Sequence, residues 1–321
     1  MFSFRFSRVF SMLAATLLLG VSMAEAKSKI VIIAGVKSHP SGQHEFAAGS
    51  KLLAKALNEQ SGLDVEAVVV TDGWPKDENV FEGAKAIVCY ADGGGKHPFV
   101  GHLDKVDALA AKGAGIMCMH YAVEVVPGQA GDPFKRWIGG FYEGGYSVNP
   151  HWDADTQVNK EHPVSRGVQP MKANDEWYFH IRFAEPPTAT PLLQATPTRE
   201  LIKRYIHWNP SADEELGKPQ TLMWGQQRPD GGRGVGFNGG HWHRNWAIDD
   251  FRKLVLNAIV WTAGVEVPEG GVKSQPISEG QINENLDVKE PMVHVKLPSP
   301  EDFNLPTADP ATAIAMPAKK Q

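Results

Sequence analysis

Side chains that can bind a metal or move a proton follow several apolar runs of the sequence. The stretch GVKSHPSGQHEF (residues 35–46) carries His39, His44 and Glu45 directly after the apolar run KIVIIAG. Later apolar runs are followed in the same way by Asp92, His97 and His120. A neutral imidazole is a ligand for Zn, Fe, Mn or Ni, and an imidazole also carries a proton near neutral pH. This recurrence predicts one shared site built from distant segments.

The stretch GGHWHRNW adds a second histidine cluster. If it is extended, the period of two places His241 and His243 on one face and Trp242 on the other, while Gly239 and Gly240 allow a close backbone approach. The alternative is a tight turn under an aromatic lid.

The metal prediction depends on residue type, because the spacing matches neither a zinc finger nor His-Glu-x-x-His. The candidate ligands of a divalent metal, Zn or similar, are His39, His44, His120 and His241. The same imidazoles are equally suited to proton transfer around a substrate without a metal.

A further carboxylate and several aromatic side chains suit a sugar site. In DEWYFHI (residues 175–181), Glu176 and Tyr178 share one strand face, so Glu176 could move a proton or orient a hydroxyl; a solvated charge is the alternative. Trp177 and Trp242 stand beside histidines, where an aromatic ring can pack against a sugar, although core packing also explains such tryptophans. His120, Glu176 and His241 are the catalytic candidates, and Trp177, Tyr178 and Trp242 are candidates for substrate binding.

The elements that must position these residues alternate between strand and helix. Strand-like runs cover 29–35, 64–70, 85–91 and 115–120, and helical patterns cover 45–60 and 102–112. This alternation predicts an α/β fold with a doubly wound, mainly parallel sheet. Ligands of such sheets bind beyond the carboxyl ends of the strands, where these histidines fall.

The sequence after residue 130 predicts an irregular insertion, a helix that closes the domain and a C-terminal tail. Residues 131–219 are irregular, aromatic and rich in polar residues, which indicates an insertion over the strand ends. A hairpin and a helix at 248–264, ended by Gly264, follow. After Val267 the composition shifts to Pro, Gly, Glu, Asn and Ser, with one short helix at most. We expect residues 266–321 to form an extended tail, lying along the domain or disordered, and residues 268–321 not to be needed for the reaction.

The N-terminus predicts export. Arg5 and Arg8 precede an apolar stretch that ends in Ala24-Glu25-Ala26, which is typical of a signal peptide (residues 1–26) cleaved after Ala26. The mature protein is therefore expected in the periplasm or outside the cell, with its main domain at 27–265. The 321 residues carry a net charge of −5 and a pI near 6.2, so the expected partner is a small molecule rather than a nucleic acid or a membrane.

Two cysteines, Cys89 and Cys118, lie in apolar runs. We expect both to be small buried side chains in neighbouring strands; a disulfide and a nucleophilic thiol are the alternatives.

An ordered set of motifs covers residues 27–264: GQHEF after the first strand, GAGIMCMHYA with His120, IGGFYEGGYSVNPHW with His151, EHPVSRGV, NDEWY with Glu176 and Tyr178, and GGRGVGFNGGHWHRNW with His241. In this set the chain resembles the ThuA-like (trehalose utilisation) family, a branch of the class I glutamine amidotransferase-like, flavodoxin-like fold. The resemblance implies an α/β domain of carbohydrate metabolism acting on a disaccharide or an oxidised (keto) sugar, and it adds His151 to the residues expected to bind substrate. His39 and His243 depart from the plainer family pattern and mark either a metal-binding variant or local decoration.

Three functions remain open on the sequence. The first is a hydrolase or lyase in which histidines surround a sugar, with or without a metal. The second is a carbohydrate-binding protein without catalysis. The third is an amidase using Cys118, which the resemblance disfavours, because the amidotransferase relatives place their cysteine on a sharp elbow between small residues and Cys118 lies between two methionines.

Overall fold

A computed structural model of the chain describes residues 26–204 and 206–299, together with Met1. An eight-stranded sheet in the order β2-β1-β3-β4-β13-β12-β10-β7 forms its centre. The strands are β1 (Ser28–Ala34), β2 (Val65–Val70), β3 (Ala84–Tyr90), β4 (Gly115–Met119), β7 (Gln157–Val158), β10 (Thr190–Ala195), β12 (Gln220–Gln227) and β13 (Arg233–Phe237). The neighbours from β2 to β13 are parallel and those from β13 to β7 are antiparallel, which confirms the mainly parallel α/β prediction.

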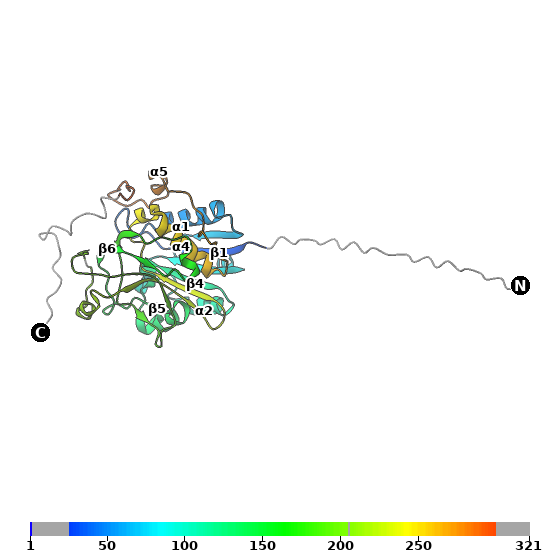
Figure 1. Cartoon of the computed structure of the whole chain (residues 1–321), viewed down its shortest axis with the longest axis horizontal. Coiled ribbons are helices and arrows are strands. Elements are labelled where there is room, and N and C mark those ends of the chain that lie inside the picture. The colour runs from blue at the N-terminus through cyan, green and yellow to red at the C-terminus, as the bar shows by residue number, and fades with distance from the viewer. Residues whose placement is uncertain (2–25, 205, 300–321) are drawn as a thin grey trace.

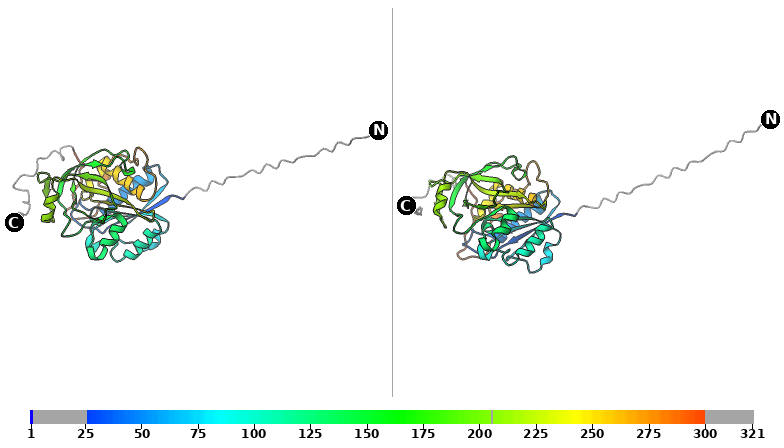
Figure 2. Two further views of the ribbon diagram at one scale, coloured as in Figure 1. Left: turned by 60° about the horizontal axis from the view of Figure 1, so that its bottom comes forward. Right: turned by 90° about the horizontal axis from the view of Figure 1, so that it is seen from below.

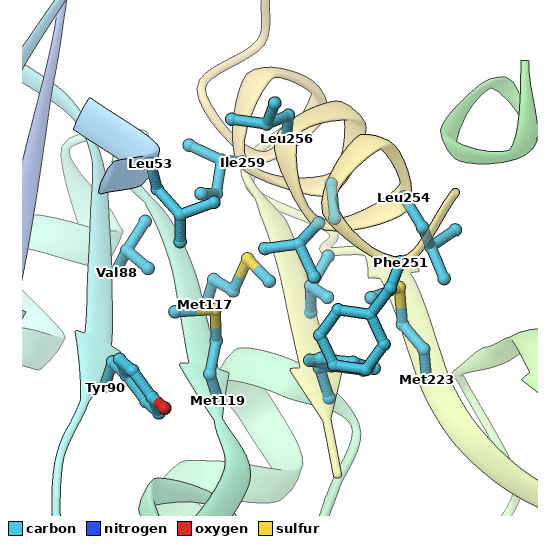
Figure 3. Packing of buried hydrophobic residues seen from close by; sticks show 14 of the residues in the cluster. Leu53, Val88, Tyr90, Met117, Met119, Met223, Phe251, Leu254, Leu256 and Ile259 are labelled. Carbon is cyan, nitrogen blue, oxygen red and sulfur yellow. The ribbon is translucent and has the colours of Figure 1, made fainter. Parts of the chain in front are cut away.

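Helices cover both faces of this sheet because its central strands are apolar on both sides. On one face, α1 (Phe46–Lys55) and α4 (Asp249–Thr262) pack over side chains such as Val88 and Met117, as Figure 3 shows. On the other face, α2 (Leu103–Ala111) and α3 (Asp132–Ile138) cover the alternate side chains of the same strands. The sheet is thereby a rigid platform for the loops at its edge.

The predicted insertion forms smaller sheets beside the main one. β6 (His151–Asp155) pairs with β8 (Lys172–Glu176) and β11 (Ile202–Arg204), and β5 (Gly140–Phe141) pairs with β9 (Arg182–Phe183). In Figure 1, β6 lies at the opposite side of the domain from the point where the chain enters β1, and Figure 2 shows the same arrangement from two other directions. The insertion therefore stands at the carboxyl ends of the parallel strands.

Short helical turns complete the fold. They are Ala56–Gln60, Glu78–Phe81, Gly94–Lys96, His120–Val123, Pro127–Gly131, Pro163–Ser165, Pro210–Glu215 and His243–Ala247. The predicted helix at 45–60 is thus α1 followed by a wider π-helical turn, and the predicted strand at 175–181 already ends at Glu176. Gly264 follows α4 with a φ of +77°, the left-handed conformation expected after a helix end.

The two cysteines lie where the sequence predicts. Cys89 of β3 and Cys118 of β4 are register partners in neighbouring strands, and both are buried free thiols. The described part of the tail runs along the domain and includes α5 (Glu279–Ile282). Residues 2–25 of the predicted signal peptide and residues 300–321 lie outside the described residues. Of the helices described, none combines the length and apolarity needed to cross a membrane.

Candidate functional site

Four side chains converge at the carboxyl edge of the sheet. His44 lies in the loop after β1, His120 directly after β4, Glu176 at the end of β8 and His241 in the loop after β13. One ligand atom from each lies within 4.8 Å of the corresponding atoms of the others, and all four side chains are buried. We call this set the four-residue cluster.

The spacing inside the four-residue cluster fits one small divalent ion. His44 Nε2 lies 3.0 Å from His120 Nε2 and 3.0 Å from His241 Nδ1. Glu176 Oε2 lies 3.1 Å from His241 Nδ1 and 3.4 Å from His120 Nε2. Ligands at about 2.1 Å from a zinc ion are roughly 3.4 Å apart when tetrahedral, so these contacts need little adjustment to admit the ion.

The hydrogen bonds of the ring nitrogens that point away from the four-residue cluster determine which nitrogens of His44 and His120 carry a proton. His44 Nδ1 lies 3.3 Å from Asp92 Oδ1, and His120 Nδ1 lies 2.9 Å from the Asn238 carbonyl oxygen. Both oxygens only accept hydrogen bonds, so each Nδ1 carries a proton and, while the ring is neutral, each Nε2 presents a lone pair. Two lone pairs 3.0 Å apart repel unless a cation or a proton lies between them. An outer hydrogen bond of this kind is the usual support of a metal-binding histidine.

The backbone at these histidines is held in an uncommon conformation. His44 has a φ of 46° and His120 a φ of 54°, in the left-handed region that residues other than glycine rarely adopt. The His44 amide donates to the His241 carbonyl oxygen at 3.0 Å, which ties the first loop to the last. Such conformations persist where the surroundings hold them, and they are frequent at functional sites.

A buried carboxylate, Asp175, fixes the loop that carries His241. It accepts hydrogen bonds from the Gly240 amide, the His241 amide and the Asn245 side chain, each at 2.9 Å. Gly240 has a φ of +115°, which favours glycine at this turn. Asp175 precedes Glu176 in the motif NDEWY, but its supporting role was missed because its partners lie more than 60 residues away.

The electrostatics of the four-residue cluster favour an ionised carboxylate beside imidazoles. Burial alone would raise the pKa of Glu176, but its hydrogen bonds to His120 and His241 and their charges hold the pKa well below the usual range. Asn149 also donates to Glu176 Oε1 at 3.0 Å. Burial, followed by the charges of His120 and His241, holds the pKa of His44 well below its ordinary value, so its ring is neutral. Burial also lowers the pKa of His120, but Glu176 outweighs it and the net pKa is raised.

Three of the residues predicted to bind substrate border the four-residue cluster. His151 is the cross-strand partner of Glu176, and its Nε2 lies 3.8 Å from Glu176 Oε1. Burial and then the charge of His241 lower the pKa of His151 to about 3. The ring of Tyr178 lies 5.0 Å from that of His120, and the ring of Trp242 lies 4.8 Å from that of His241.

Trp177 does not border the cluster, which corrects its prediction. It alternates with Glu176 along the chain, so it points into the core, packs against Phe237 and Phe251, and donates to the Ala173 carbonyl. Of the two conformations left open for GGHWHRNW, the structure has a turn: the chain enters a helical turn at His243–Ala247, so this segment is not extended through His243.

His39 lies beside the four-residue cluster rather than in it. Its ring stacks on that of His44 at 3.6 Å, and its Nδ1 lies 3.7 Å from Asp92 Oδ1. With His44 and Asp92 it forms a second group of possible ligands. The side chain of His39 is 36% exposed, so this group meets solvent where the four-residue cluster does not.

Glu124 is a nearby carboxyl that the sequence did not single out. Burial and then the charge of Glu176 raise its pKa to about 7. Glu124 follows His120 by four residues, a spacing that could have drawn attention to it. A surface groove of about 1140 Å³ lies elsewhere; residues such as Trp137, Arg182 and Gln226 line it, and none of the four-residue cluster does.

A family model and solved structures match this chain over nearly the whole α/β domain. The family model described as ThuA, trehalose utilisation, matches residues 31–262. A solved ThuA-like protein from Bacteroides uniformis aligns with a TM-score of 0.53 and 19% identity over 76% of this chain and 94% of that one. Another, from Parabacteroides merdae, aligns with a TM-score of 0.52 and 17% identity over 80% of this chain and 99% of that one. A search of curated proteins finds no match.

Proposed function

The chain belongs to the ThuA family, described as trehalose utilisation, and from that premise we propose that it is a metal-dependent enzyme of carbohydrate metabolism. Its metal is a divalent ion, Zn or similar, held by His44, His120, His241 and Glu176. Its reaction is hydrolysis or lyase cleavage of a disaccharide or an oxidised (keto) sugar. Glu176 then serves as a ligand rather than as the proton carrier expected from its motif.

The observation that carries this proposal is the convergence of three imidazole nitrogens and one carboxylate oxygen, all buried and within 4.8 Å of one another. The outer hydrogen bonds of His44 and His120 turn two lone pairs toward each other at 3.0 Å, and the ionised Glu176 lies 3.4 Å from one of them. In the neutral rings these two lone pairs need a proton or a cation between them, and a divalent ion satisfies both rings and the carboxylate at once. Cys118, whose pKa burial raises well above its usual value, has the opposite of what a nucleophilic thiol needs.

A divalent ion at this position would supply Lewis-acid polarisation of a sugar oxygen. The side chains around it account for the remaining requirements of such a reaction. Trp242 is partly exposed and offers a ring face against which a sugar packs, and His151 is neutral and able to hydrogen-bond a hydroxyl. Glu124, with a pKa near 7, is suited to give or take a proton at neutral pH.

The alternative is a carbohydrate-binding protein without catalysis on the same fold. It would use the same aromatic side chains but need neither the four-residue cluster nor a proton-transfer group, so the convergence of three imidazoles and a carboxylate favours the enzyme. We further propose that the chain acts in the periplasm or outside the cell on a small-molecule carbohydrate, since its N-terminal segment has the pattern of a signal peptide.

A substrate screen tests the enzymatic proposal. Metal-free protein, reloaded separately with zinc, manganese or nickel, is incubated with disaccharides and 3-keto-glycosides, and products are followed by chromatography. We expect turnover that chelator abolishes, metal restores and Glu124→Gln lowers strongly. Binding of a sugar without product under all metals would instead favour the binding protein.

A further inference from the structure

The C-terminal tail returns to the loop that carries His44. The Val293 amide donates to Ser41 Oγ at 3.0 Å, and the Asp287 amide donates to Glu45 Oε2 at 2.8 Å. Lys37 Nζ donates to the Val288 carbonyl oxygen at 3.0 Å. We call residues 287–295 the strap. It makes contacts with the first loop on both sides of His44 in the sequence.

A buried ion pair stands at the centre of these contacts. Lys289 Nζ lies 3.1 Å from Glu45 Oε1, and the two side chains are 5% and 0% exposed. The same ammonium donates to the Gln43 carbonyl oxygen at 2.7 Å and lies 3.5 Å from that of His44. Burying two charges costs desolvation that their attraction barely repays, so such a pair is better explained by a specific geometry than by stability alone.

Lys289 and Glu45 together close the backbone around His44. Glu45 Oε1 accepts from the Gly42 amide at 2.9 Å, and Lys289 binds the carbonyl of the intervening Gln43. The loop from Gly42 to Glu45 is therefore held on its amide side and on its carbonyl side. His44 lies within it at a φ of 46°, a conformation that the chain does not adopt readily without such support.

We propose that Lys289 is a positioning residue, which through Glu45 and the carbonyl of Gln43 holds His44 with its Nε2 directed into the four-residue cluster. The strap is then part of the site, and the expectation that the reaction does not need the tail is revised. The expected effect on zinc affinity rests on the proposed metal function. The positioning of His44 by Lys289 does not require a metal. The contact was invisible in the sequence because Lys289 and Glu45 are 244 positions apart in a segment without periodicity.

The test uses the mature chain with Lys289→Met and, as a matched control, Lys296→Met, which removes an exposed lysine from the same part of the tail. Zinc affinity is measured by competition with a chromophoric chelator. We expect Lys289→Met to weaken zinc binding at least 10-fold and the control to leave it unchanged. With cobalt in place of zinc, the visible absorption of Lys289→Met should change as one nitrogen ligand is lost.

A double-mutant cycle separates positioning from general stability. Glu45→Gln should weaken zinc binding in the same direction, and the combination with Lys289→Met should be less than additive, because both changes break one ion pair. If Lys289→Met does not fold, Lys289→Gln, which keeps a hydrogen-bond donor, takes its place. Wild-type affinity and an unchanged cobalt spectrum in a folded Lys289 variant would overturn the proposal.

Hydrogen exchange distinguishes failure of this inference from failure of the metal proposal. The His44 amide bonds to the His241 carbonyl, so its exchange reports the loop in metal-free protein. Faster exchange of residues 42–45 in Lys289→Met than in Lys296→Met supports the strap even if the wild type binds no metal. Equal exchange in the two variants would refute it.

Discussion

Histidine is buried in two regions of this molecule, and the two environments differ in what their ring nitrogens contact. His97 lies on the face of the sheet that α2 and α3 cover. Its Nε2 donates to the Ala122 carbonyl oxygen at 2.9 Å, and its Nδ1 accepts from the Phe99 amide at 3.0 Å. In the four-residue cluster, His44 and His120 have one partnered nitrogen each, and the other nitrogens face one another. Burial is nearly complete in both regions.

The comparison teaches that burial alone does not mark a functional histidine. His97 is satisfied by backbone groups as a neutral ring, so it has no capacity left for a ligand and serves packing. His44 is also a neutral ring, but its Nε2 and the Nε2 of His120 face each other, and the Nε2 of His120 lies near Glu176. The distinction lies in ring nitrogens that face other titratable side chains instead of backbone groups, and the following changes would break or sharpen it.

The largest difference is expected between His120→Ala and His97→Gln. Loss of a direct ligand should weaken zinc binding by a factor of at least about 100, while the change at His97 should leave it as in the wild type. Competition titration with a chromophoric chelator gives both affinities, and circular dichroism confirms the fold of each variant. Equal losses would show that the two regions do not differ as described.

An intermediate effect is expected from the carboxylate behind His44. Asp92→Ala removes the acceptor for His44 Nδ1, so the ring can present either nitrogen inward, and zinc affinity should fall about 10-fold to 100-fold. Ser38→Ala, which removes only the hydroxyl that donates to Asp92 at 2.9 Å, is the milder control and should cost less. Reversal of this order would contradict the support assigned to Asp92.

A pH effect on stability is expected from His97, in addition to that of the neutral rings His44 and His151. Burial lowers the pKa of His97 to about 4, below an unfolded value near 6.5. Its neutral ring therefore contributes stability that is fully present above pH 6.5 and is lost as the pH falls through about 4. Between pH 7 and 4.5 this amounts to roughly 2 to 3 kcal/mol of unfolding free energy.

Urea unfolding of metal-free protein at several pH values measures this contribution. His97→Gln, which has no group that titrates in this range, should lose less stability between pH 7 and 4.5 than the wild type. Parallel curves for the two proteins would mean that the acid sensitivity arises elsewhere.

The sequence predicted the parallel half of the fold well because its strands are continuous apolar runs. β1, β3 and β4 each begin and end within one residue of the expected bounds. The meeting of His44, His120 and His241 followed from topology, since each lies after a strand whose carboxyl end reaches one edge. Trp177 was misplaced because its nearness to a histidine in the sequence does not show which face of the strand it takes, and it alternates with Glu176 into the core. His243 leaves the face of His241 because the chain enters a helical turn there, and a period of two does not predict where extended geometry stops.

The residues that the sequence did not reveal all depend on contacts with distant parts of the chain. Asp175 and Lys289 act on backbone groups of distant loops, and such contacts leave no local pattern in composition or spacing. Glu124 acquires its raised pKa from burial and from Glu176, neither of which can be read from its neighbours in the chain.

The smallest effect is expected at Cys118, on the sheet face that packs beneath α3. Cys118→Ala removes one buried sulfur atom and should cost about 1 kcal/mol of unfolding free energy, with zinc affinity unchanged. Thermal unfolding and the chelator titration together check this. Loss of turnover with the fold and zinc affinity intact would revive the thiol mechanism.

Metal content tests the central claim most directly. Metal-free mature protein is dialysed to equilibrium against buffered zinc, and retained metal is counted per chain by elemental analysis beside the double variant His44→Ala/His241→Ala. We predict about one tightly held zinc per wild-type chain and almost none in the double variant. A folded wild-type protein that retains no zinc, or a double variant that retains as much, would contradict a metal centre at His44, His120, Glu176 and His241.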